Sequence, residues 1–235
     1  MSTIIPSVLL ATTLPLSPSP YAMAIHGPEV RITEADTIAF LGDSITQLGT
    51  EKPFGYVNLV KAGLKARGVE PTFVPAGVSG NTCRQMLARL DADVLSKKPT
   101  WLFLSCGVND APNGYEDYRK NPGVPLDEYK AKITEIIDRA IAAGAKPVIL
   151  TATPVVEEPH VANTNLVPYN AFLRETAAAR GLPLFDVGSV IAMAHASKDD
   201  PMVRAFTVDG THLNERGNRI FADVILAGIQ TPTKK

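Results

Sequence analysis

Residues 37–47 read TIAFLGDSITQ, an apolar run that ends in Gly42 and the polar pair Asp43 and Ser44. A short apolar run bounded by glycine is typical of a buried strand in a parallel sheet, and ligands bind beyond the carboxyl ends of such strands. We therefore expect Ser44 at that edge, where its hydroxyl can act as a nucleophile or cap the next helix. On this stretch alone, capping is the commoner role for such a serine.

The same pattern returns four times further along the chain. Apolar runs that predict strands alternate with stretches of helical periodicity, which end at glycines such as Gly68 and Gly144. The strands are expected at residues 37–41, 71–74, 101–104, 147–151 and 182–185. Because right-handed crossovers place helices on both faces of a parallel sheet, this order predicts an α/β fold around a five-stranded parallel sheet.

The composition is that of an ordinary globular domain, with 235 residues of which 45% are hydrophobic and 20% charged. Positive and negative side chains number 23 and 24, so the charge gives no reason to expect a nucleic-acid partner or an anionic membrane surface. The glycine-rich phosphate motifs of nucleotide-binding folds do not occur in the sequence. We expect one domain, residues 25–235, that needs no cofactor.

Residues 1–24 resemble a secretory signal peptide. An apolar stretch at 4–11 is followed by three prolines and by Ala22-Met23-Ala24, which matches the small-x-small pattern of a cleavage site. The segment before the apolar stretch has no Lys or Arg, so a disordered tail is the alternative. The stretch is also too short to span a bilayer. Cleavage would leave a mature protein that begins near Ile25 and is secreted or periplasmic.

Five polar or glycine positions fall beyond the ends of the predicted strands, and all of them are expected at one edge of the sheet: Ser44, Gly80, Asn109, Asp209 and His212. A serine hydroxyl is a weak nucleophile, so it needs a base and a group that orients the base. His212 and Asp209 fit these roles, although an Asp-x-x-His motif alone is more often a loop ion pair or a cap. Backbone N–H groups at Ser44 and Gly80 and the Asn109 amide fit an oxyanion hole.

Four short motifs match, in order, the four blocks of the SGNH (GDSL-type) hydrolases: Gly42-Asp43-Ser44-Ile45, residues 78–82 around Gly80, Gly107-Val108-Asn109-Asp110 and Asp209-Gly210-Thr211-His212. The chain resembles this family over residues 37–228, with Ile45 in place of the leucine of the family's nickname. The resemblance implies that Ser44 is the nucleophile, that His212 is the base and that Asp209 orients it. It also implies that Gly80 and Asn109 complete the oxyanion hole, and that the fold is a flavodoxin-like three-layer α/β/α sandwich.

The resemblance implies a serine esterase, and its substrate is a small-molecule or glycan ester. We favour short acyl groups, acetyl above all, on carbohydrate, because the loops beyond the strands are rich in hydrogen-bonding groups and lack an apolar trough, notably at 81–82, 113–118 and 157–165. A lysophospholipase or thioesterase, an acyltransferase and a non-catalytic glycan-binding module are the alternatives. Asp43, Asn81, Asp110 and His160 are the candidate substrate-binding residues, although both aspartates also suit hydrogen bonds to local backbone.

Neither the histidines nor the cysteines predict a metal site. His26, His160 and His195 have no second ligand at a suitable spacing, and His160 lies in a polar loop that either lines the cleft or is solvated. Cys83 and Cys106 follow strands that the family's strand order places about two strand spacings, or ~10 Å, apart. This predicts two free, partly buried thiols unless the two loops converge.

Overall fold

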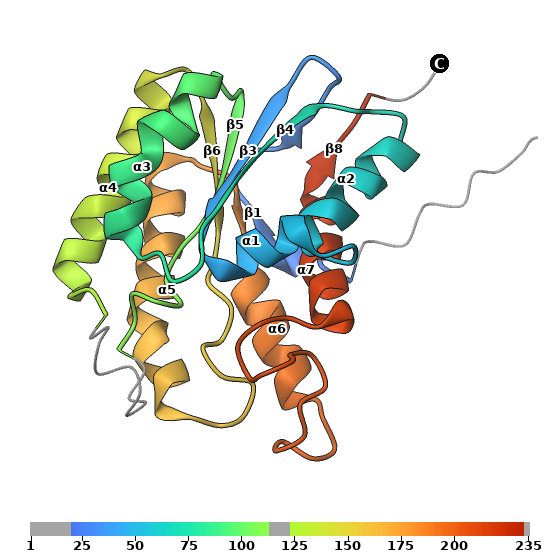
Figure 1. The fold of residues 1–235 in the computed structure, drawn as a ribbon, viewed down its shortest axis with the longest axis vertical. Coiled ribbons are helices and arrows are strands. Elements are labelled where there is room, and N and C mark those ends of the chain that lie inside the picture. Colours follow the sequence, from blue (N-terminus) through green and yellow to red (C-terminus); the bar gives the residue numbers. More distant parts are fainter. Residues whose placement is uncertain (1–19, 113–122, 233–235) are drawn as a thin grey trace, which may run out of the picture.

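A computed structural model describes residues 20–112 and 123–232 of the chain (Figure 1). Its main sheet has six strands in the order β1-β7-β6-β5-β3-β4. In chain order these are β1 (Ile25–His26), β3 (Thr37–Gly42), β4 (Thr72–Gly77), β5 (Trp101–Ser105), β6 (Lys146–Leu150) and β7 (Leu184–Phe185). The five strands β3 to β7 are parallel, which confirms the predicted sheet. The sixth, β1, was not predicted; it pairs antiparallel with β7 and makes the sheet mixed.

Helices cover both faces of the sheet, so the three predicted layers are present (Figure 1). The helices α1 (Ser44–Glu51), α2 (Tyr56–Ala66), α6 (Val187–Ala196) and α7 (Glu215–Gly228) contact one another on one face. The helices α3 (Cys83–Asp93), α4 (Leu126–Ala142) and α5 (Val161–Arg180) lie together on the other. Short 3-10 turns at Ala22–Ala24 and Leu95–Lys97 and a two-stranded sheet of β2 (Val30–Arg31) with β8 (Ile229–Gln230) complete the fold.

Aromatic side chains pack β3 against β5 and helix α2 against α7. The ring of Phe40 stacks on Phe103 of β5 at 5.0 Å between centroids, and Tyr56 of α2 stacks on Phe221 of α7 at 4.0 Å. All four side chains are buried. Because β3 is covered on both faces, it reads as a continuous apolar run rather than an alternating one.

The register of the sheet brings the ends of three strands level with one another. Gly42 at the end of β3 pairs with Gly77 of β4, and Leu41 pairs with Leu104 of β5. A Cβ at Gly77 would lie 2.2 Å from the backbone nitrogen of Gln47, so glycine allows β4 to end directly against α1. The loops that follow these strands therefore begin at the same edge.

The folded part of the chain begins before the predicted domain boundary at residue 25. Tyr21 packs against the core, Ala24 is buried in it, and the carbonyl of Ala24 accepts a 2.7 Å hydrogen bond from the backbone N–H of Asp186. Residues 1–19 lie outside the described part, so processing of the N-terminus stays a prediction. Across residues 20–112 and 123–232, no helix combines the length and the apolar character that crossing a membrane requires.

Candidate active site

Ser44 is the first residue of α1, and its neighbour Asp43 caps that helix. The Asp43 carboxylate accepts a 2.9 Å hydrogen bond from the backbone N–H of Ile45, which gives Asp43 the capping role that Ser44 alone suggested. Only 8% of Ser44 is exposed, and its hydroxyl contacts the ring of His212, which is 168 residues away in the sequence. The hydroxyl is thus held at a helix N-terminus and is free to react.

Ser44, His212 and Asp209 form a continuous chain of hydrogen bonds. The Ser44 Oγ lies 2.9 Å from His212 Nε2, and His212 Nδ1 lies 2.6 Å from Asp209 Oδ2. The other Asp209 oxygen accepts from the backbone N–H groups of Thr211 and His212 at 3.0 and 2.8 Å. Partial burial alone would raise the pKa of Asp209, but these hydrogen bonds outweigh it and hold the pKa below its ordinary value. The ionised carboxylate therefore fixes the ring with Nε2 toward the serine.

Three groups are the predicted donors of the oxyanion hole. The Ser44 N–H is at the N-terminus of α1, where backbone N–H groups lack partners within the helix. Gly80 is exposed and has a φ of +74°, a conformation that favours glycine. The Asn109 amide donates to the backbone carbonyl of Asn81 at 3.1 Å, and its second N–H is available to a ligand. The arrangement can stabilise a developing oxyanion.

Two side chains that the sequence did not single out hold these loops in place. The Arg89 guanidinium of α3 donates to the Asn81 side chain at 2.7 Å and to the carbonyl of Gly42 at 2.9 Å. It thereby joins the end of β3 to the segment that orients Asn109. The Gln47 side chain of α1 accepts a 2.7 Å hydrogen bond from the backbone N–H of Ser79, directly before Gly80.

Known proteins are similar to this chain in both sequence and fold. The sequence model of the GDSL-like lipase/acylhydrolase family matches residues 40–220. The chain belongs to this family. An acetylxylan esterase of Geobacillus stearothermophilus is 33% identical over 135 residues, which cover 51% of this chain and 58% of that relative, so little more than half of the relative is matched. The uncharacterized lipoprotein YqeF of Bacillus subtilis is 26% identical over 222 residues, covering 82% of this chain and 88% of YqeF.

Solved structures agree with the family assignment. The crystal structure of Axe2, an acetylxylan esterase from Geobacillus stearothermophilus, superposes with a TM-score of 0.73 at 25% identity, covering 85% of this chain and 97% of Axe2. The predicted SGNH hydrolase fold is thereby confirmed. The protein is an SGNH esterase, a hydrolase of carboxylic esters.

Two of the four candidate substrate-binding residues of this SGNH esterase are enclosed by protein. Asp43 is 2% exposed and Asp110 is 0% exposed, so the structure does not support the prediction that they touch substrate. Burial, opposed in part by the hydrogen bond from Ile45, raises the pKa of Asp43 to about 6. Burial also raises the pKa of Asp110, whose carboxylate accepts from the backbone N–H of Cys83 at 2.9 Å. The predicted hydrogen bond to local backbone is observed for Asp43, whereas Asp110 binds the backbone of Cys83, 27 residues away in the sequence.

The two cysteines are free, as predicted, and are fully rather than partly buried. Their loops converge on Asp110, because the Cys106 thiol donates to its second oxygen at 3.3 Å while Cys83 contacts the first. The strands β4 and β5 are two positions apart in the sheet, as predicted, and the loops that follow them converge. Burial and the nearby Asp110 carboxylate raise the pKa of both thiols, which keeps them protonated and unreactive.

The other two candidates, Asn81 and His160, are half-buried, and their substrate contacts stay predictions. The Asn81 side chain is held by Arg89, and His160 is the N-cap of α5, where its Nδ1 accepts from the backbone N–H of Ala162 at 3.1 Å. The polar stretch 113–118 lies outside the described residues. Within the part of the chain that is described, no group of three His, Cys, Asp or Glu side chains is placed to hold a metal ion.

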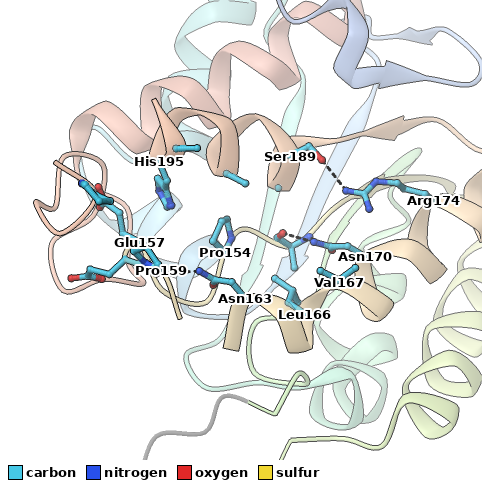
Figure 2. Close-up of a pocket in the computed structure, with 16 residues that line it drawn as sticks. Pro154, Glu157, Pro159, Asn163, Leu166, Val167, Asn170, Arg174, Ser189 and His195 are labelled. Atoms are coloured by element: carbon cyan, nitrogen blue, oxygen red, sulfur yellow. Dashed lines mark hydrogen bonds between the residues drawn. The ribbon is translucent and has the colours of Figure 1, made fainter. Parts of the chain in front are cut away.

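A pocket of about 350 Å³ lies between α5 and α6, beside the loop that follows β6 (Figure 2). Its walls are mostly apolar, with Pro154, Leu166 and Val167 among them. Among its polar side chains, Asn170 is bound to both backbone groups of Ala152, and Arg174 is bound to Asp186 and Ser189. None of the three residues of the Ser44 hydrogen-bonded chain lines this pocket, so it is separate from the reacting groups.

Proposed function

We propose that this esterase removes acetyl groups from carbohydrate hydroxyls through an acyl-serine formed on Ser44. The observation that carries the proposal is the chain of hydrogen bonds from Asp209 through His212 to Ser44, at 2.6 and 2.9 Å. Matches to a Geobacillus stearothermophilus acetylxylan esterase, in sequence and in structure, support the substrate class.

The chemistry follows from the placement of the groups. As Ser44 Oγ attacks the acyl carbon, its proton moves to His212 Nε2 and the carbonyl oxygen becomes an anion. The Ser44 and Gly80 N–H groups and the Asn109 amide donate to that oxyanion. His212 then protonates the departing sugar hydroxyl, and the acyl-serine forms. In the second half, His212 takes a proton from water, whose oxygen attacks the acyl carbon and releases acetate and free Ser44.

The preference for a short acyl group rests on what surrounds the reacting serine. A long chain gains ~0.8 kcal/mol for each buried methylene, so an enzyme for such chains needs an apolar trough that begins at its nucleophile. The described segments that carry the four family motifs contain Gly80, Asn81, Asn109 and Thr211, with Val78 and Val208 as exposed apolar side chains beside them. The apolar pocket between α5 and α6 does not include Ser44.

A series of p-nitrophenyl esters from acetyl to octanoyl, together with acetylated xylo-oligosaccharides, tests the proposal. We expect kcat/KM to be at least tenfold higher for acetyl than for octanoyl esters, because the described part of the enzyme has no apolar trough at Ser44 to bury the added methylenes of the longer chain. Acetate should be released from the oligosaccharides, and Ser44→Ala should release none. A maximum at octanoyl would make the protein lipolytic, and acetyl found on an added sugar would make it an acyltransferase.

An extracellular or envelope location accompanies this function. Residues 1–24 support it, as do the relatives, which include a protein named as a lipoprotein and one named as an acetylxylan esterase. Expression of the full chain in a secreting bacterium, followed by fractionation and intact-mass measurement, provides the test. Soluble cytoplasmic protein that retains residues 1–24 would contradict the location.

A further inference from the structure

Glu157 is a buried carboxylate that the proposed chemistry does not use. It lies in the loop between β6 and α5, and its side chain is 0% exposed. In Figure 2 it lies against the loop that leads from α6 toward α7. A buried charge is costly unless every oxygen is paired, so the partners of this carboxylate indicate what it does.

Five donors converge on the two oxygens of Glu157. One oxygen accepts from Lys198 Nζ at 3.0 Å and from the backbone N–H of Ala205 at 2.6 Å. The other accepts from the backbone N–H and the hydroxyl of Thr207, at 2.8 and 2.6 Å. The N–H of Phe206 is shared between both oxygens, at 3.2 and 3.1 Å. Every backbone N–H from 205 to 207 is therefore bound to this one side chain.

The same contacts continue to the segment that carries Asp209 and His212. The Thr207 hydroxyl, which donates to Glu157, accepts from the N–H of Gly210 at 3.1 Å, and the carbonyl of Gly210 accepts from the N–H of Glu157 at 2.6 Å. Next to it, the Thr211 hydroxyl donates to the carbonyl of Val155 at 2.6 Å. Gly210 and Thr211 are the two residues between Asp209 and His212. Their hydrogen bonds to residues 155 and 157 and to Thr207 therefore hold the backbone that joins Asp209 to His212.

The charge of Glu157 is balanced where it lies. Burial would raise the pKa of this carboxyl, but the hydrogen bonds from Thr207, Ala205, Lys198 and Phe206 outweigh it and lower the pKa to about 2. The partner Lys198 is itself nearly enclosed, with 6% of its side chain exposed. The carboxylate stays ionised at any pH at which a histidine can act as base.

We propose that Glu157 is a positioning residue that sets the location of His212 relative to Ser44. It acts through the backbone of 205–207 and the Thr207 hydroxyl, and it does not touch the reacting atoms. Ser44 sits at the junction of β3 and α1. His212 sits on a loop that local hydrogen bonds fold on itself, such as the one from the Val208 N–H to the His212 carbonyl at 2.8 Å, and the Glu157 contacts join this loop to the segment before α5. A misplacement of about 1 Å between reacting groups costs roughly 10²-fold in rate, so the loop needs this anchor. The inference rests on the proposed roles of Ser44 and His212.

Two neighbouring glutamates provide a matched comparison. Glu157→Gln removes the charge and replaces one of the two accepting oxygens by an NH2 group, which cannot accept from the 205–207 N–H groups. Glu158→Gln changes a carboxylate whose described partner is the Arg204 side chain. For p-nitrophenyl acetate we expect Glu157→Gln to lower kcat by roughly 10²-fold, with KM changed less than about threefold. Glu158→Gln should stay within about twofold. Equal losses in both variants would overturn the proposal.

Thr207→Val is the second variant in case Glu157→Gln does not fold. It keeps the carboxylate and the shape of the side chain but removes the hydroxyl that joins Glu157 to Gly210. We expect a loss of about tenfold in kcat, with circular dichroism unchanged. A Thr207→Val enzyme with the parent's kcat would contradict a connection through this hydroxyl.

The His212→Ala background separates positioning from a general effect on the fold. If Glu157 acts through His212, adding Glu157→Gln or Thr207→Val to His212→Ala should lower the small residual rate no further. A further loss of tenfold or more would show that Glu157 acts elsewhere. Should His212→Ala itself retain the parent's rate, the proposed function fails first, and that result is distinguishable from a failure confined to Glu157.

Discussion

Asp43→Asn is expected to stabilise the protein at neutral pH. The Asp43 carboxyl is 2% exposed, lies near the buried Asp110, and uses one oxygen to accept from the Ile45 N–H. An asparagine keeps that accepting oxygen and caps helices as well as aspartate does, but it carries no charge. The substitution therefore removes the cost of a buried charge and leaves the cap in place.

The size and sign of the effect follow from the raised pKa of Asp43. Burial moves this pKa from 3.8 to about 6, a change of about 2 units that corresponds to ~3 kcal/mol. Below pH 3.8 the residue is protonated in both the folded and the unfolded chain, and its contribution to stability is fully present. Between 3.8 and about 6 the unfolded chain ionises first, so stability falls as the pH rises. Above about 6 the loss is complete and constant.

Urea unfolding followed by circular dichroism between pH 4 and pH 8 measures this effect. The free energy of unfolding of Asp43→Asn minus that of the parent should grow by up to ~3 kcal/mol across this range. Subtracting the parent's free energy of unfolding removes the contributions of the other titrating groups, which both proteins share. One of them is His195, whose pKa is lowered by burial. Asp199→Asn, at an exposed position, should show no such trend. A difference that is flat with pH, or that falls as pH rises, would refute the reasoning.

Three further predictions concern the reaction. Ser44→Ala should abolish ester hydrolysis while the unfolding temperature stays near that of the parent. In steady-state assays His212→Ala should lower the rate about as much as Ser44→Ala does, and the double variant should lower it little more. Asn109→Ala should lower kcat by roughly 10² to 10³ with little change in KM, and a pure KM effect would instead assign Asn109 to ground-state binding. Arg89→Met should lower kcat by about tenfold, because the Asn81 side chain and the Gly42 carbonyl lose the guanidinium that holds them. In an Asn109→Ala background the same substitution should lower kcat no further, and additive losses would contradict this.

Sequence patterns predicted the parts of this protein that are local. The strand and turn at 37–44 were predictable because a buried strand is apolar and because glycine and polar residues end it. The residues Ser44, Asp209 and His212 were predictable as a group because their motifs follow strands that end at one edge, and the structure brings them together. Their catalytic roles remain a proposal.

What the sequence did not predict depends on contacts between distant segments. Glu157 reads as part of a polar, solvated or cleft-lining loop, and only a partner segment 48 to 50 residues away makes it a buried, fully paired group. Arg89 holds Gly42 across 47 residues, which no periodicity reveals. The strand β1 has two residues, too few for any pattern.

The antiparallel strand β1 has a consequence for how molecules of this esterase meet. The open edge of a sheet can pair with another chain and start aggregation, and β1 covers that edge of the parallel sheet with only the two residues Ile25 and His26. At the opposite edge, β4 contains Pro75, which has no N–H to offer an incoming strand. The two residues of β1 therefore separate the edge of β7 from other chains, and their loss would leave β7 open to edge-to-edge pairing.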